Sequence, residues 1–275
     1  MRPQTDIRIE FDEKGELRIS APANSHYIRA KKQDEEYQKK KGRQHAFTFT
    51  DMENIQEIIS GIPEKHCGYL LYLQCFLGYE YMLQIKKMHM GKAEMMKVLQ
   101  IKGTAFRLFI KDMMDNEIMF ETVMGGETRY GINPKFHFRG QTNNIRVVKS
   151  FSASVKKLYG AVNPKDLGFV YKLLPFIHQQ TNTLCANPYE QDIGAIRYLC
   201  KEQIAEITGV DEKTVYRKLR KLKFDNQYVF AEVIRGKHHF YKVNPFVFYR
   251  KNGYPDPTLR EIFLLKKGFT IRENE

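Results

Sequence analysis

The fold is decided by one stretch, residues 201–245, which reads KEQIAEITGVDEKTVYRKLRKLKFDNQYVFAEVIRGKHHFYKVNP. Its pattern predicts a helix over Lys201–Thr208, a break at Gly209, a second helix and a two-stranded hairpin. Asp211 is placed to cap the second helix, because its carboxylate can accept a backbone N–H that is free at that end. The stretch therefore predicts helix, tight turn, helix and hairpin in succession.

The second helix of this stretch has one apolar and one basic side. Val215, Leu219 and Leu222 recur at i, i+4 and i+7, so we expect them to face the core. The rest of its surface carries six cations, which are Lys213, Arg217, Lys218, Arg220, Lys221 and Lys223. A helix of this kind suits the major groove of DNA, and the alternative is a merely solvated basic face. The segment ITGVDEKTVYRKLRKL resembles the winged helix-turn-helix family over about 45 residues, which implies DNA binding.

Composition supports a polyanionic partner. The chain has 275 residues, 42% of them hydrophobic, and a formal net charge of +13. That charge favours nucleic acid over an acidic membrane surface, because no basic amphipathic helix with exposed bulky apolar residues is evident. No apolar run approaches 18 residues, and the start lacks an apolar signal core. We expect a cytoplasmic, nucleoid-associated protein that does not enter a membrane.

The sequence carries little that indicates catalysis. The four cysteines, Cys67, Cys75, Cys185 and Cys200, form no Cys-x-x-Cys pair, so we expect buried free thiols. A phosphate-binding Gly-x-x-x-x-Gly-Lys loop is missing, as is a carboxylate cluster for two metals. His238 and His239 are adjacent in a predicted strand and would point to opposite faces, which disfavours a shared metal. We expect no enzyme, no metal and no cofactor.

The first half of the chain predicts a similar succession of elements. Residues 7–19 predict a β-hairpin, and the basic segment 29–43 is either a flexible linker or an arm that follows phosphates. A helix through Ile59 is expected to begin with the capping box Thr50-x-x-Glu53, and the apolar segment 68–82 to form a core helix. Further elements follow, namely helices over 92–100 and 104–116 and strands over 118–123 and 128–133.

Comparison of the two halves indicates an internal repeat. GYLLYLQCFL at 68 matches GFVYKLLPFI at 168, and TAFRLFIKDMMDNEIMFE at 104 lies against TVYRKLRKLKFDNQYVFAE at 214. The hairpins close alike, with INPKFHFRG at 132 and VNPFVFYRKNG at 243. The sequence predicts a mainly α protein with small β wings (α+β) and two tandem winged helix-turn-helix domains. We expect the first copy to bind DNA more weakly or to serve partly in dimer packing.

The expected division of the chain has five parts. They are a hairpin and basic arm (1–45), a first winged helix (46–140), a connector with a short helix near 154–159 (141–162), a second winged helix (163–250) and a C-terminal helix and tail (251–275). That last helix docks either on its own domain or on a second subunit. The Asn-Pro closures followed by FRG or YRKNG resemble Gram-positive plasmid replication proteins of the RepL type; phage and plasmid regulators use similar domains.

The function predicted is sequence-specific binding of double-stranded DNA, as a transcription regulator of a phage or plasmid. A replication initiator that binds origin repeats and a protein-interaction module are the alternatives. Partners beyond DNA would be a second copy of the chain and host replication or transcription proteins. In the second copy the predicted DNA contacts are Lys213, Thr214, Tyr216, Arg217, Lys218, Arg220, Lys221, Arg235, Lys237 and His238, and in the first they are Lys102, Thr104, Arg107 and Lys111.

Overall fold

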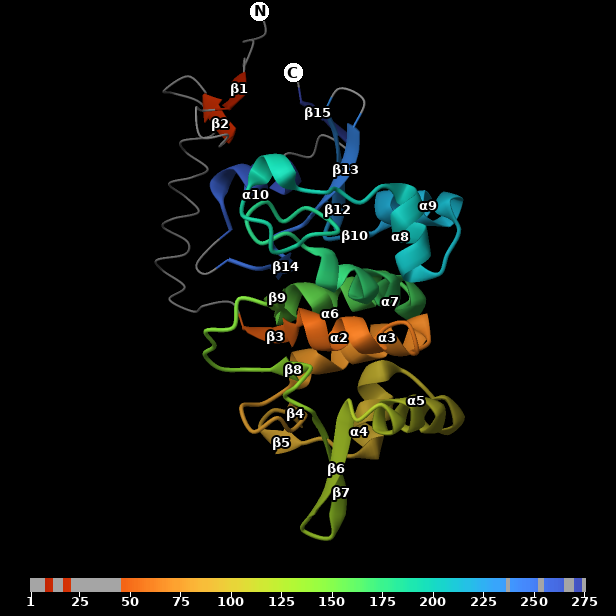
Figure 1. Ribbon diagram of the computed structural model, residues 1–275. Helices are drawn as coiled ribbons and strands as arrows, with labels where there is room; N and C mark the ends of the chain where they lie inside the picture. Colours follow the sequence, from red (N-terminus) through yellow and green to blue (C-terminus); the bar gives the residue numbers. More distant parts are fainter. Residues whose placement is uncertain are drawn as a thin grey trace, which may run out of the picture.

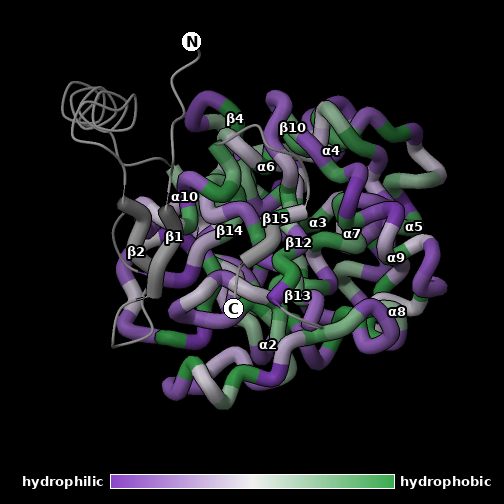
Figure 2. The backbone as a smooth tube through the Cα atoms, turned by 90° about the horizontal axis from the view of Figure 1, so that it is seen from above, coloured by the Kyte–Doolittle hydropathy of each residue, from purple (hydrophilic) through white to green (hydrophobic). Residues whose placement is uncertain are grey.

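The computed structural model shows a mixed α+β chain whose sheets are small. It describes residues 8–11, 17–20, 46–235, 238–251, 255–264 and 270–273. Its elements stack in layers, with the central helices between an upper and a lower group (Figure 1). Hydrophobic residues run along these central helices, and hydrophilic segments are frequent around the rim (Figure 2). In the part of the chain that is described, no helix is long and apolar enough to cross a membrane.

A four-stranded sheet with an internal two-fold symmetry joins the two halves. Strands β3 (Phe47–Asp51) and β9 (Val147–Phe151) pair antiparallel at its centre, and Phe49 lies opposite Lys149. The outer strands are β8 (His137–Phe138) beside β3 and β14 (Phe248–Tyr249) beside β9. Because positions 49 and 149 pair and are 100 residues apart, a two-fold rotation exchanges the central strands.

Each central strand leads directly into a helix, α2 (Met52–Ile58) or α6 (Ser152–Ala161). The short helix predicted near 154–159 within the connector is confirmed as α6, whereas strand β9 was not predicted; β9 and α6 are the counterparts of β3 and α2. Low apolar periodicity in this segment concealed the match. The cap of α2 is Asp51, whose carboxylate accepts the N–H of Asn54 at 3.0 Å. Thr50, the predicted cap, is instead buried in the sheet.

Two helices, α3 (Glu64–Leu73) and α7 (Pro164–Leu173), cross in the middle of the molecule at Gly68 and Gly168. A Cβ at Gly68 would overlap the carbonyl oxygen of Pro164, and a Cβ at Gly168 would overlap that of Glu64. The two contacts are equivalent under the two-fold rotation. Glycine is required at both positions because the backbones of the helices touch there.

The predicted core helix over 68–82 begins earlier and ends earlier in the structure. After α3 and the 3-10 turn η1 (Gln74–Phe76), the chain turns into the short strands β4 (Gln84–Ile85) and β5 (Met88–His89). Tyr81 has a positive φ of 64°, which is incompatible with a continuing helix. The apolar composition of the segment 68–82 predicted a helix throughout, but a buried extended segment has the same composition. The second half matches with η2 (Leu174–Phe176).

The succession of helix, turn, helix and hairpin occurs in both halves. In the first half it comprises α4 (Lys92–Leu99), α5 (Gly103–Asp115), β6 (Met119–Met124) and β7 (Glu127–Ile132). In the second half it comprises α8 (Lys201–Thr208), α9 (Glu212–Lys221), β12 (Phe230–Arg235) and β13 (His238–Val243), with the small hairpin β10 (Lys223–Phe224) and β11 (Gln227–Tyr228) inserted. The elements predicted for these two segments are confirmed.

The register between the two helix pairs differs by one residue from the sequence alignment. Both first helices end on a left-handed residue, Gln100 with φ 55° and Gly209 with φ 72°. Phe106 and Val215 are the first buried residues of α5 and α9. The offset within these helices is therefore 109 residues and not 110. Leu108 of α5 is consequently the counterpart of Arg217 of α9.

The C-terminal segment covers the second half. Helix α10 (Pro257–Leu264) buries Leu259 and Phe263 against Ala231 and Tyr249, so it docks on its own unit. Strand β15 (Thr270–Glu273) then adds to β12 in parallel. Near the N-terminus, β1 (Arg8–Phe11) and β2 (Leu17–Ser20) form the predicted hairpin. The basic segment 29–43 lies outside the described residues.

A buried polar network lies beside the central sheet. The hydroxyl of Thr50 donates to Gln74 Oε1 at 3.1 Å, and His137 Nδ1 lies 3.1 Å from the same hydroxyl. The Tyr171 hydroxyl is 2.9 Å from His137 Nε2. Thr50 can then accept from Nδ1–H while Nε2 accepts from Tyr171, which fixes one neutral tautomer. Burial lowers the pKa of His137 to about 3.

Substitution of the crossing glycines tests the helix contact. Gly168→Ala should lower the free energy of unfolding by about 3 kcal/mol or more, because the helices must separate to admit a methyl group. Urea denaturation followed by circular dichroism measures it. Gly160→Ala, in α6, is the matched control, since a Cβ there meets nothing within 4 Å and should be neutral or stabilising by up to about 1 kcal/mol. Equal stability of the two variants would contradict the close contact.

His137 should make folding stability sensitive to acid. Its folded pKa lies below the ordinary value of about 6.5, so the unfolded state takes up the proton first as pH falls. Stability should decline below pH 6.5 by about 1.4 kcal/mol for each pH unit from this residue alone. In His137→Phe, which copies Phe248 at the equivalent place, the decline between pH 6 and pH 4 should be shallower. Identical slopes in the two proteins would refute the assignment.

Candidate nucleic-acid interface

Helix α9 presents a row of cations to solvent. Lys213, Arg217 and Arg220 are exposed and follow one another at i, i+4 and i+7, on the side opposite the buried Val215 and Leu219. The exposed Lys221 lies beside this row. Among the described residues, no acidic side chain forms a salt bridge with any of these four cations. Their positive charge is therefore available to an anion from solvent.

The N-terminal end of α9 is held in place by its cap. The carboxylate of Asp211 accepts the N–H of Thr214 at 2.9 Å, as the sequence predicted. Hydrogen bonds from Thr214 lower the pKa of Asp211. Thr214 and Tyr216 are half-buried on either flank of the basic row, and the ammonium of Lys201 lies 5.6 Å from the centre of the Tyr216 ring. The first turn of α9 is thus capped by a side chain of the preceding residue.

Lys218 does not lie with the other cations. Its side chain is only 10% exposed, and its ammonium is 2.8 Å from Glu64 Oε1 and 3.3 Å from Asp166 Oδ1. The expectation that Lys218 lies on the exposed basic side of α9 was therefore wrong. It is three residues after Val215 and four before Leu222, which places it on the buried side of α9. It connects α9 to the first turns of both α3 and α7.

The second hairpin adds fewer cations than the sequence suggested. His238 is exposed, whereas Arg235 is half-buried with its guanidinium 5.7 Å from the centre of the Phe240 ring. Lys237 lies outside the described residues. His239 Nδ1 is 3.2 Å from Glu232, so this histidine faces the sheet's own carboxylate. Of the predicted hairpin residues that the structure describes, His238 is the exposed one.

The first unit carries a sparser set. Lys102, Thr104, Arg107 and Lys111 are exposed on or just before α5, as predicted. With the corrected register, Thr104, Leu108 and Lys111 occupy the places of Lys213, Arg217 and Arg220. Arg107 corresponds to Tyr216 and so lies on the flank. Asp112, the counterpart of Lys221, pairs with His66 at 2.6 Å. The row on α5 therefore contains one cation, Lys111, whereas the row on α9 contains three.

The two helices α5 and α9 lie on the same side of the molecule, one below and one above the central layer (Figure 1). The view from above places both on that side as well (Figure 2). Their hairpins, β6–β7 and β12–β13, extend in opposite directions. This arrangement follows from the two-fold symmetry of the central sheet and the α3–α7 crossing. One elongated ligand can therefore contact both helices on one face.

Two arginines in the repeated closing segments have a structural role that the sequence did not indicate. Arg139 donates to the carbonyl of Leu77 at 3.1 Å, and Arg250 donates to the equivalent carbonyl of Ile177 at 2.8 Å. Burial lowers the pKa of Arg250 to about 10. The preceding asparagine is structural as well, since Asn244 donates to the carbonyl of Tyr228 at 2.8 Å. These arginines and asparagines recur at matching places in the two halves, and this repetition is the sequence signal for their structural role.

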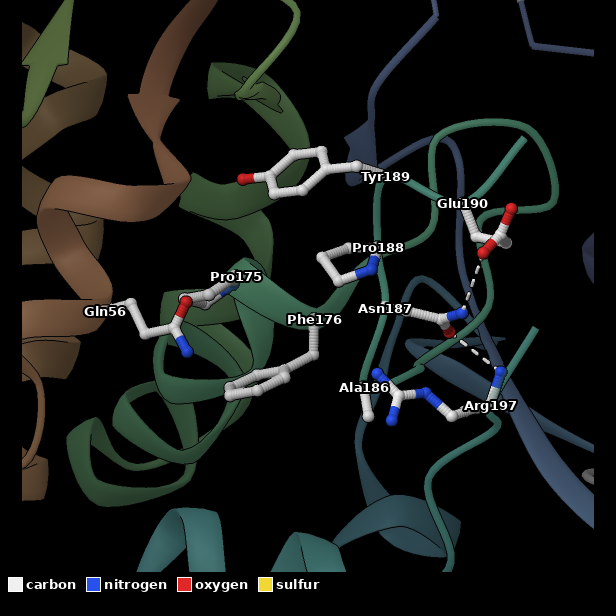
Figure 3. A pocket seen from close by; sticks show the side chains of 9 residues that line it. All are labelled: Gln56, Pro175, Phe176, Ala186, Asn187, Pro188, Tyr189, Glu190 and Arg197. Atoms are coloured by element: carbon white, nitrogen blue, oxygen red, sulfur yellow. Dashed lines mark hydrogen bonds between the residues drawn. The ribbon is translucent and has the colours of Figure 1, made fainter. Parts of the chain in front are cut away.

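The second half has about ten residues more than the first, around 187–196, and they form an inserted loop that reaches α2 of the first half. Pocket-lining side chains include Gln56 of α2, Phe176 and the loop residues Pro188 and Arg197, around a volume of about 270 Å³ (Figure 3). Asn187 braces the loop by donating to Ala195 and accepting the N–H of Arg197. Arg250 also donates to the carbonyl of Pro188 at 2.7 Å. Through Gln56 the loop adds a further contact between the halves.

Three cysteines match the expectation of buried thiols, and one does not. Cys67, Cys75 and Cys185 are buried, which raises the pKa of each thiol to about 12. Cys200 is exposed because it immediately precedes α8. Within the described ranges, no three His, Cys, Asp or Glu side chains gather where they could hold a metal ion.

Comparison with known proteins adds no assignment to this geometry. Neither a protein-family model, nor a curated protein, nor a solved structure matches the chain. The basic row on α9, with α5 on the same side of the molecule, is therefore the feature that indicates a ligand.

Replacement of Lys218 separates its role from that of the exposed cations. Lys218→Ala leaves Glu64 and Asp166 without their shared cation, so unfolding free energy should fall by about 1–3 kcal/mol. Lys221→Ala is the control on the same helix and should change stability by less than about 0.5 kcal/mol. Chemical denaturation of both variants measures this. A Lys218 variant as stable as the control would show that the pairing contributes nothing.

Proposed function

We propose that this chain is a sequence-specific double-stranded DNA-binding protein built from two tandem winged helix-turn-helix units. The observation that carries the proposal is the unpaired basic row on α9, held by a capped helix in a succession of helix, turn, helix and hairpin. In DNA-binding proteins of this kind, the second helix enters the major groove and the hairpin contacts the backbone. The net charge of +13 supports a polyanionic partner.

The chemistry of the row favours base reading near the start of α9. Lys213 and Arg217 lie in its first half, where recognition helices contact base edges, and either side chain can donate to guanine O6 and N7. Arg220 and Lys221 lie further along the helix, and His238 on the hairpin, where phosphates are the expected partners. Phosphate contacts position a protein, whereas base contacts specify the sequence. Thr214 and Tyr216 complete the contact on the flanks.

The internal two-fold symmetry suggests how the target is arranged. Helices α5 and α9 on one side of the chain would enter successive major grooves, roughly 10 base pairs apart, on one face of the duplex. Their opposite orientation implies two half-sites in inverted order. Since the two rows differ in sequence, the half-sites would differ as well. The second unit would supply most of the affinity, and the first would extend the site through Lys102, Thr104, Arg107 and Lys111.

A role as transcription regulator of a phage or plasmid is our proposal for the biological context, and replication initiation is the alternative. The closing segments resemble those of RepL-type proteins, but their asparagine and arginine side chains bind backbone carbonyls of this chain. They therefore indicate a fold and do not indicate a role in replication. Genome-wide crosslinking of the native protein distinguishes the two roles. Occupancy at promoters supports regulation, whereas repeated sites beside an A·T-rich origin support initiation.

Arg217→Ala should weaken binding to the specific site by about 1–3 kcal/mol and binding to random duplex much less. Fluorescence anisotropy over a range of salt concentrations measures both, with Arg197→Ala on the inserted loop as the exposed-arginine control. Equal losses on specific and random duplex would remove Arg217 as a base reader. No salt-dependent affinity for any duplex would instead favour a protein-interaction module.

A further inference from the structure

Leu108 is exposed in the centre of the row that α5 presents to solvent. Its side chain is 57% exposed, although α5 buries Phe106, Phe109 and Met113 on its opposite side. The flanking positions of the row are polar, with Thr104 one turn before it and Lys111 one turn after it. An apolar residue at such a place lowers solubility without contributing to the core. Exposed apolar side chains are common singly on protein surfaces, and what distinguishes Leu108 is its place in the row that corresponds to the cations of α9.

The corrected register gives Leu108 a precise counterpart in the second unit. The left-handed residues Gln100 and Gly209, together with the buried residues Phe106 and Val215, set the offset at 109. Leu108 thus occupies the place of Arg217, in the second turn of its helix. Whatever Arg217 reads in one half-site, Leu108 meets the corresponding base in the other.

The chemistry of the major groove offers one apolar group, the C5-methyl of thymine. Arginine at this place favours guanine, because its guanidinium donates to two acceptors on that base. Leucine has no donor or acceptor, so it can favour a base only through contact with that methyl. The polar neighbours Thr104 and Lys111 supply hydroxyl and ammonium groups for the adjacent backbone or base edges.

We infer that Leu108 reads a thymine methyl, so that the half-site under α5 carries thymine where the half-site under α9 carries guanine. This inference rests on the proposed function and adds the base that the first unit selects. The target is then an inverted site with one half that is read by charge and one that is read by apolar contact. The first unit contributes sequence discrimination even though its row has few cations.

The test replaces thymine by deoxyuridine, which removes only the methyl group. A duplex selected from a random pool by the full-length protein is remade with deoxyuridine in one half-site at a time. In the α5 half-site the substitution should weaken binding by the unmodified protein about fourfold, which corresponds to about 0.8 kcal/mol for one buried methyl. For Leu108→Ala the same two duplexes should bind with equal affinity. Leu108→Arg should shift the preference at that base from thymine to guanine.

The control variant is Ile145→Ala, because Ile145 is 59% exposed and lies outside both helices. It should retain the fourfold difference between thymine and deoxyuridine. Specific binding by the unmodified protein with no effect of deoxyuridine in the α5 half-site would overturn the reading of Leu108 while the proposed function stands. Loss of the thymine preference in Ile145→Ala as well would also overturn it. Absence of salt-dependent duplex binding would overturn both proposals together.

Discussion

The arrangement of the molecule depends on the contact between two helix backbones at Gly68 and Gly168. Neither position admits a Cβ, since each would overlap a carbonyl oxygen of the opposite helix. Backbones that touch in this way cannot slide past one another, because the surrounding side chains are interlocked in a common core. The antiparallel pairing of β3 with β9 repeats the same symmetry in the sheet. Together they fix where α5 and α9 lie, and Lys218 connects α9 to this centre through Glu64 and Asp166.

The frame is symmetric, but the side chains on it are not. Three members of the buried network, Gln74, Thr50 and His137, come from the first half, and the residues at the equivalent places of the second half are Leu174, Ser150 and Phe248. In the exposed rows of α5 and α9 the second half is the more polar one. Its helix α9 has a row of three cations, whereas the row on α5 has one cation and Leu108. The two halves thus share their backbone contacts and differ in the side chains on their surfaces.

Much of the second unit was predictable from the sequence, because local signals specify it. Asp211, Gly209 and the spacing of Val215, Leu219 and Leu222 each have a local meaning, and the structure places them as expected. Strand β9 was not predictable in this way, since it is defined by pairing with a strand 100 residues away. The same holds for Lys218, whose partners Glu64 and Asp166 lie far away in sequence. Charge composition identifies a basic helix, but tertiary pairing decides which of its cations remain free.

The register of α5 shows a further limit of sequence comparison. Identical residues such as Arg107 and Arg217 favoured an offset of 110, whereas backbone conformation and burial require 109. Hydroxyl-radical footprinting of a complex with one chain per duplex shows whether both helices contact DNA. We expect two protected segments, about one helical turn apart on one face of the duplex, with Arg217→Ala weakening protection in one segment first. A single protected segment, or protection on opposite faces, would contradict this expectation.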